Sequence, residues 1–189
     1  MNTGNTVIKG TDFSQSPMSA REYESAVFSN CNYSRCDLSR VLFTDVIFDT
    51  CDLSLAKLSE TTFQDATFRN CRMLGMHFDH CNRFGLRVVL ENCNLGHSSF
   101  YGVKHPGGSF TDCRFNDVDF TGCVLSGSHF DRCDFSGAVF DHADLERCDF
   151  STSINYTIDP ELNRLKKARF SLFGLPGLLE KYGIETVPV

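Results

Sequence analysis

The chain has 189 residues, of which 41% are hydrophobic and 22% are charged, and these values are typical of a single globular domain. The net charge of −6 disfavours direct binding of nucleic acid, because phosphate recognition needs a basic surface. No apolar run approaches the ~20 residues of a membrane span, and the first residues lack the basic and apolar parts of a secretory signal. We therefore expect a cytoplasmic protein without membrane contacts.

A five-residue repeat dominates the sequence. A large apolar residue recurs at every fifth position, as in Phe110, Phe115 and Phe120, and a small residue stands two positions before each one. Five residues advance an α-helix by about 500°, so the apolar groups drift and form no stripe. On a straight strand they would alternate between the two faces. The chain must therefore turn once per repeat, which describes a solenoid wound around its own core.

The N-terminal part divides into a cap and a regular stretch. Residues 1–22 fit the repeat loosely, and we expect them to cover the first coil, because solenoid ends need a different surface. From Tyr23 to Phe78 the register is firm. Fourteen of the 18 Phe residues occupy the large position of the repeat between residues 23 and 155, which assigns them to core stacking.

The register then slips by two residues, because Leu90 follows Phe78 at a distance of twelve instead of ten. The segment 82–87 must hold the extra residues, and Gly85 would permit an unusual backbone there. An insertion tolerated at a corner is the favoured interpretation. The alternative is a contact loop, whose contact residues would be Arg83 and Phe84.

A second irregularity, at residues 101–108, keeps the register. His105 stands where a large apolar residue belongs, and Pro106-Gly107 is a turn dipeptide. We expect this backbone to bulge outward and to place His105 in solvent, with Lys104 and His105 as possible partner contacts.

The stretch 108–150 carries a net charge of −6, equal to that of the whole chain. The acidic residues that form this candidate partner-binding surface are Asp112, Asp117, Asp119, Asp131, Asp134, Asp141, Asp144, Glu146 and Asp149. With four repeats to a coil they would be spread over all four faces. Solubility alone would also account for such charges on a stacked fold.

After Phe150 the repeat gives way to an exit turn, a last partial coil at residues 166–170, and a short helix. Pro176 suits the first turn of that helix and Gly183 its C-terminal cap. This end of the chain either caps the last coil or forms a dimer contact. Its candidate residues are Leu172, Phe173, Leu175, Leu178, Leu179, Tyr182 and Ile184.

All ten cysteines occupy the small position of the repeat. In a disulfide framework or a metal site, the positions of the cysteines would follow their bonding partners and would not keep to the repeat. We therefore interpret these residues as reduced, buried thiols. Some of them would stack at twenty-residue spacing, as Cys31 and Cys51 do, which leaves an occasional disulfide open.

No motif in the sequence indicates an enzyme. No G-x-S-x-G, C-x-x-C, Walker or dinucleotide motif occurs. His77, His80 and Cys81 have the look of a metal cluster, but the register turns the histidines outward and the cysteine inward. A rod filled with Phe side chains has no pocket of its own, so we expect no catalysis, cofactor or metal.

The pattern A/C-D/N-L/F-S/T-x resembles the pentapeptide-repeat family over roughly residues 23–155. The resemblance implies an all-β fold, a right-handed quadrilateral β-helix with four repeats to a coil. About seven coils stacked at about 4.8 Å would give a rod on the order of 30 Å long. Residues 1–22 would form its N-terminal cap, and residues 156–189 a C-terminal cap with a short helix.

One group within this family consists of dimeric rods that are shaped and charged like duplex DNA. It includes the Qnr-type quinolone-resistance proteins, mycobacterial MfpA and immunity proteins against albicidin and microcin, which bind type II topoisomerases and dimerise through their C-terminal ends. The segment Cys71–Gly75 is similar to the C-x-M-L-G of some members, and residues 155–159, 167–171 and 178–184 resemble the albicidin-immunity tail. The chain departs from the Qnr pattern because it lacks a long loop between coils.

Two functions follow from this resemblance and from the irregular segments. The first is a DNA mimic that binds DNA gyrase or topoisomerase IV as a homodimer and protects against gyrase-targeting antibiotics such as quinolones. The second is a structural or adaptor rod whose partner contacts residues 82–87 and 101–107.

Overall fold

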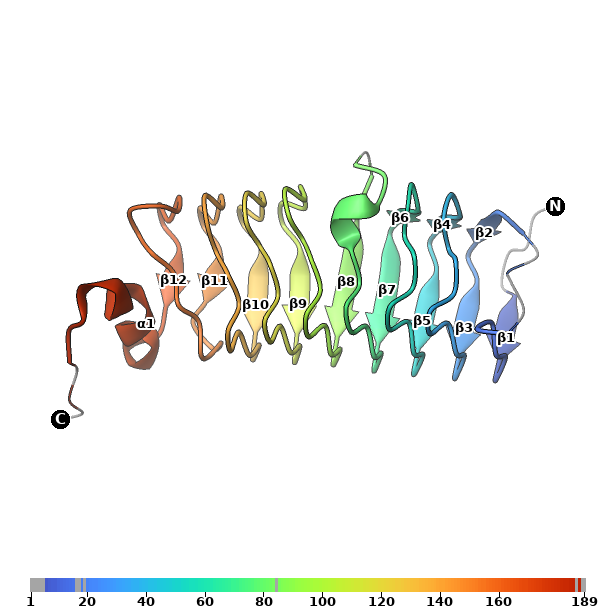
Figure 1. Ribbon diagram of the computed structural model, residues 1–189, viewed down its shortest axis with the longest axis horizontal. Helices are drawn as coiled ribbons and strands as arrows, with labels where there is room; N and C mark the ends of the chain where they lie inside the picture. The colour runs from blue at the N-terminus through green and yellow to red at the C-terminus, as the bar shows by residue number, and fades with distance from the viewer. Residues whose placement is uncertain (1–5, 16–17, 19, 84, 186, 188–189) are drawn as a thin grey trace.

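The computed structural model describes residues 6–15, 18, 20–83, 85–185 and 187, and it has the form of a rod. The chain winds through about eight turns, with its two termini at opposite ends (Figure 1). The predicted all-β, right-handed quadrilateral β-helix with a short C-terminal helical cap is confirmed.

One face of the rod is a continuous parallel sheet in which each coil contributes one short strand. Its strands, in spatial and chain order, are β1 (Val7–Lys9), β3 (Val27–Ser29), β5 (Ile47–Asp49), β7 (Ala66–Arg69), β8 (Val88–Glu91), β9 (Ser109–Thr111), β10 (His129–Asp131), β11 (Asp149–Phe150) and β12 (Arg169–Phe170). A second face carries β2 (Glu22–Glu24), β4 (Leu42–Thr44) and β6 (Thr62–Gln64) in the first coils. Single parallel bridges such as Asn32 to Asp52 and Asp37 to Lys57 align the remaining faces.

The corners explain how a five-residue unit turns. The residue two positions after the large apolar one adopts the left-handed region in most repeats, with φ of 53° at Asn30 and 64° at Gly122. Asn, Asp and Gly tolerate this region best, which fits the many polar corner residues of this chain. One left-handed residue per repeat therefore bends each extended piece toward the next face.

The core is made of aromatic columns that run along the rod. Phe28, Phe48 and Phe68 stack with ring centroids 5.0 and 4.9 Å apart. Neighbouring columns meet edge to face, as Phe115 does with Phe110 at 5.8 Å. Both arrangements are favourable for aromatic rings, and they fill most of the interior.

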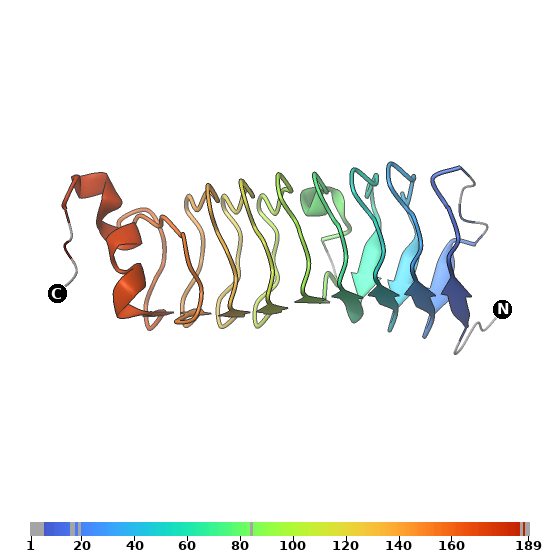
Figure 2. The same ribbon diagram turned by 90° about the horizontal axis from the view of Figure 1, so that it is seen from below.

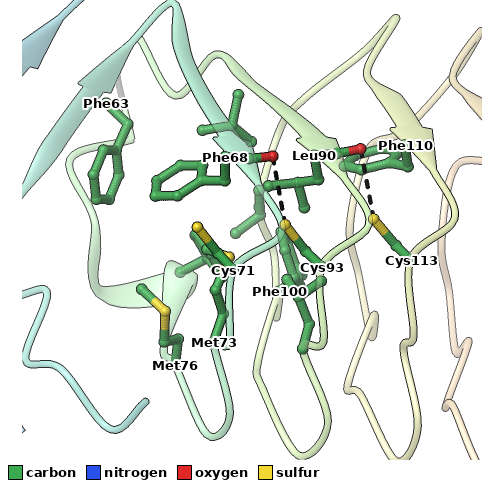
Figure 3. Packing of buried hydrophobic residues seen from close by; sticks show 14 of the residues in the cluster. Phe63, Phe68, Cys71, Met73, Met76, Leu90, Cys93, Phe100, Phe110 and Cys113 are labelled. Atoms are coloured by element: carbon green, nitrogen blue, oxygen red, sulfur yellow. Dashed lines mark hydrogen bonds between the residues drawn. The ribbon is translucent and has the colours of Figure 1, made fainter. Parts of the chain in front are cut away.

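A column of thiols lies beside the aromatic rings. Each thiol reaches the backbone carbonyl of a large residue in the preceding coil, as Cys93 does with Phe68 and Cys113 with Leu90, at 3.4 and 3.5 Å (Figure 3). All ten cysteines are buried and none forms a disulfide. The residues that form the column are Cys31, Cys51, Cys71, Cys93, Cys113 and Cys133.

The predicted two-residue slip lies between β7 and β8, where Ala66 pairs with Val88 across 22 residues instead of 20. The 3-10 turn η1 (Phe78–His80) begins the enlarged coil, and it is the green coiled ribbon beside β8 in Figure 1. The prediction that residues 101–108 bulge outward is wrong. His105 N and Gly107 N donate regularly to Val124 O and Ser126 O of the next coil, at 2.9 and 3.0 Å.

Three short turns close the C-terminal end, and Figure 2 shows them beyond the last coil. They are η2 (Leu172–Gly174), α1 (Pro176–Leu179) and η3 (Glu180–Tyr182). Pro176 opens α1, and Gly183 caps η3 with φ 61°, so the predicted helix exists but changes to 3-10 geometry after one turn. Gly177 packs so close to the Tyr156 carbonyl that a Cβ there would overlap it.

Candidate partner-binding surfaces

The acidic residues of the stretch 108–150 serve the fold as well as the surface. Asp119, Asp134, Asp144 and Asp149 each accept the backbone N–H two residues later, at 2.8 to 3.2 Å. Such a hydrogen bond favours a turn. The repeat therefore selects Asp at this outward position for a local structural reason, independently of any partner.

Arginines of neighbouring coils neutralise some of these carboxylates. Arg132 contacts Asp112 at 2.7 Å, Arg164 contacts Glu146 at 2.7 Å, and Arg169 contacts Asp149 at 2.8 Å. The hydrogen bond from Arg132 lowers the pKa of Asp112, and the one from Arg164 lowers the pKa of Glu146. Two of the three arginines belong to the tail, which places positive charge next to the last acidic coil.

Other acidic residues of this stretch have no lysine or arginine partner among the described residues. In the described parts of the chain, no ion pair joins Asp117, Asp119, Asp134 or Asp141 to either residue type. Burial opposes the ionisation of Asp134, but hydrogen bonds from Asn155, Ser136 and Asn116 outweigh it and lower its pKa. These four carboxylates carry most of the uncompensated negative charge in this half of the rod.

The acidic residues do not gather on one face. Asp119 aligns with Ser99, Asp134 with Arg114, and Asp144 with Val124, each pair on a different face, while Asp149 lies in β11. The expected spread over all four faces is therefore present, and the negative charge surrounds the rod.

The enlarged coil creates a pocket of about 340 Å³. It is lined by Phe78, Asp79, Cys81, Asn82, Arg83, Leu86, Tyr101, Gly102, Val103 and Lys104. Arg83 and Lys104, which belong to the two irregular segments, are thus brought together around one pocket. Phe84 lies outside the described residues.

His105 is buried, with 7% of its surface exposed, so the prediction that it faces solvent is wrong. Its Nε2 donates a hydrogen bond to Val88 O at 3.0 Å, and its ring meets Phe110 edge to face. A Cβ at Gly108 would lie 2.8 Å from the His105 ring. The absence of a side chain at Gly108 therefore leaves room for the imidazole at a core position.

The suspected cluster at residues 77–81 is only partly as predicted. Cys81 points into the core, as expected, with 6% of its surface exposed. His77 and His80 nevertheless converge, because their rings stack with centroids 4.9 Å apart and Asp79 lies between them. The predicted orientations, with both histidines outward and Cys81 inward, are confirmed, but Asp79 was not considered from the sequence.

The C-terminal end exposes large apolar side chains. Phe173 is 96% exposed, Leu172 82% and Ile184 55%, whereas Leu178 packs against the core. Leu175 and Tyr182 are also exposed, and Leu179 is half-buried. Lys181 joins Asp159 and Glu161 at 2.6 Å each, which fixes the tail on the last coil while the apolar side chains face outward. Nowhere in the described residues does a helix have the length and apolar character needed to cross a membrane.

Comparison with known proteins agrees with this architecture. The profile of the family described as pentapeptide repeats matches eight copies, over residues 24–59, 47–82 and 113–151. The solved structures that the chain resembles include two trypsin-treated variants of QnrB1, a plasmid-mediated fluoroquinolone resistance protein. Both are 21% identical, cover 97% of this chain and 98% or 100% of their own, and have TM-scores of 0.66 and 0.67. No curated protein matches the sequence.

Proposed function

Because the chain belongs to the pentapeptide-repeat family, we propose that it is a non-catalytic rod that binds DNA gyrase or topoisomerase IV in place of duplex DNA. Binding of this kind would modulate the enzyme or protect it from gyrase-targeting antibiotics. QnrB1, whose fold matches this chain from end to end, is a fluoroquinolone resistance protein, which supports the proposal.

The observation that carries the proposal is the negative charge around the C-terminal half of the rod. Asp117, Asp119, Asp134 and Asp141 project from rigid corners and faces without a lysine or arginine partner in the described structure. A topoisomerase holds DNA in a basic saddle, and complementary charge steers and orients partners. Asp134 aligns with Arg114 and Asp119 with Ser99, on two adjacent faces, so these carboxylates can present negative charge to a wall of such a saddle.

A second copy of this chain is the proposed cover for the apolar C-terminal end. Leu172 and Phe173 are exposed and belong to η2 at the C-terminal end of the rod, where a two-fold axis would join two identical ends. Several exposed apolar side chains at one end of a molecule are typical of an interface. The dimer would be a rod of twice the length, with its acidic halves adjacent at the centre.

The decisive experiment measures DNA supercoiling by purified gyrase during titration with this protein, with and without a fluoroquinolone. Salt-sensitive inhibition, or relief of the drug, is expected at low protein concentration. The test variant changes Asp117, Asp119, Asp134 and Asp141 to Asn, which preserves the hydrogen-bond acceptors of the turns. It should require a higher concentration than the wild type for the same effect.

The matched control changes four acidic residues of the N-terminal half to their amides, namely Asp37, Asp45, Asp52 and Asp65. It has the same net charge as the test variant. If both variants lost gyrase inhibition equally, the effect would depend on the overall charge of the chain and not on the position of these four carboxylates. No effect of the wild type at a large excess over gyrase would refute the proposal.

Sedimentation of the double variant Leu172→Ser, Phe173→Ser should show a monomer where the wild type is a dimer.

The alternative, an adaptor rod, rests on the pocket of about 340 Å³ at the enlarged coil. The double variant Arg83→Glu, Lys104→Glu reverses two charges at its rim. This variant should abolish recovery of the partner from lysate under the adaptor hypothesis, and it should leave gyrase inhibition unchanged under the topoisomerase hypothesis.

A further inference from the structure

The enlarged coil changes the geometry of one corner. In the two preceding coils the equivalent corner residues, Arg40 and Glu60, adopt the left-handed region with φ of 60°. At the third position the chain forms the 3-10 turn η1 instead, with His80 N donating to His77 O at 3.2 Å. The two-residue insertion thus replaces an ordinary corner by a helical one.

A 3-10 turn brings particular side chains together. Residues three apart eclipse one another in this geometry, so His77 and His80 project from the same side of the turn. Their rings stack at 4.9 Å with an interplanar angle of 14°. Asp79 Oδ1 lies 3.3 Å from His77 Nδ1, and Asp79 Oδ2 lies 3.6 Å from His80 Nε2. One ligand atom from each of the three residues lies within 4.8 Å of the others.

The environment of Asp79 suits a cation. Its side chain is 20% exposed, and its Oδ1 is a buried oxygen that accepts no hydrogen bond in the described structure. The two imidazoles are more than half exposed, at 55% and 57%. The carboxylate is thus mostly buried, whereas the histidines can rotate toward a shared ion and leave its outer side open to solvent.

We propose that His77, Asp79 and His80 form a binding site for a divalent first-row transition metal ion of the Zn²⁺ class. Two imidazoles and a carboxylate are ligands that such ions prefer, whereas Mg²⁺ and Ca²⁺ prefer a shell of oxygens. Metal–ligand bonds of roughly 2.0–2.2 Å would draw the three atoms closer together, and rotation of the exposed imidazoles supplies that movement. The remaining coordination positions face solvent. Binding would fix the turn that begins the enlarged coil.

The Asp141–His142 pair provides a comparison for the proposed metal site within the same molecule. His142 Nδ1 lies 2.7 Å from Asp141 Oδ1, which is likewise a buried oxygen. In the described residues that pair lacks a third ligand, and the only group of three ligand residues is the one at η1. The second imidazole, not the His–Asp pair itself, distinguishes the proposed site.

The test is calorimetric titration of ZnCl₂ into the full, reduced chain without a histidine tag. We expect one saturable equivalent in the wild type. His80→Asn should weaken the binding by at least about tenfold to a hundredfold, the loss typical of disturbing a metal site. His142→Asn should bind as the wild type does, and Zn²⁺ should raise the melting temperature of the wild type but not of His80→Asn.

Three results would overturn the proposal. The first is the absence of saturable binding by the wild type. The second is unchanged binding by the double variant His77→Asn, His80→Asn, provided that circular dichroism shows it folded. The third concerns the ten thiols: titration with Co²⁺ should give no thiolate charge-transfer band, and such a band would assign the ion to cysteine instead.

Discussion

Replacing His105 by leucine should make folding less sensitive to acid. The ring is buried, Nε2 donates to Val88 O, and Phe110 packs against it. Burial disfavours the charged imidazolium and lowers the pKa of His105, an effect that exceeds the opposing hydrogen bonds to Val88 and Leu86. Leucine occupies the equivalent core position in the following coils, at Leu125 and Leu145, so the substitution suits the site.

The sign and size of the effect follow from proton linkage. In the unfolded chain the imidazole has its ordinary pKa of about 6.5, so the unfolded state takes up a proton that the folded state refuses. The stabilisation is fully present above that pKa and is lost as pH falls through it. A ring that stays neutral in the folded protein costs about 1.4 kcal/mol of unfolding free energy between pH 7.5 and 5.5.

Urea denaturation at pH 7.5, 6.5 and 5.5 measures this difference. Wild type should lose more free energy of unfolding than His105→Leu over that range, by up to about 1.4 kcal/mol, with equal m-values in both proteins. The other histidines and the carboxylates titrate in both chains, so their contributions cancel in the comparison. Parallel pH profiles would refute the reasoning, because they would mean that His105 is protonated equally in the folded and unfolded states.

Three further substitutions or treatments test the packing. Phe115→Ala removes a fully buried ring that contacts four other phenylalanines, and it should cost about 3–5 kcal/mol in urea denaturation. Gly177→Ala places a Cβ against the Tyr156 carbonyl, so hydrogen exchange should become faster in the C-terminal turns and stay unchanged in β9 to β11. Burial raises the pKa of the Cys148 thiol to about 12, so thiol reagents should modify it slowly in buffer and rapidly in urea; equal rates would contradict its burial.

The regular part of the rod could be predicted because the residues within each repeat determine the conformation of that repeat. A small residue, a large apolar residue and a polar corner at fixed spacing determine one extended piece and one bend. Stacking of identical pieces then follows from the need to bury the large side chains. Phe28, Phe48 and Phe68 lie one above the other because the spacing of twenty equals one coil.

The two histidine sites could not be predicted in the same way, because each depends on a neighbour outside its own repeat. His105 is buried because Gly108 leaves space for the ring, and this compensation is visible in the sequence only when both positions are considered together. His77 and His80 converge because the insertion after Phe78 changes a corner into a 3-10 turn. The length of an insertion is readable from a sequence, but the backbone that absorbs it is not.

The 22-residue coil also has a consequence for how the chain finds its alignment. A solenoid with strictly identical coils has many nearly equivalent ways to stack, each displaced by one coil. The odd coil removes this degeneracy, because only one arrangement pairs Ala66 with Val88 and also His77 with Ser99. The 22-residue coil fixes the register in which the coils stack, as a single buried polar residue does in a coiled coil. The coils before and after the 22-residue coil can then nucleate separately and stack on each other in only one alignment.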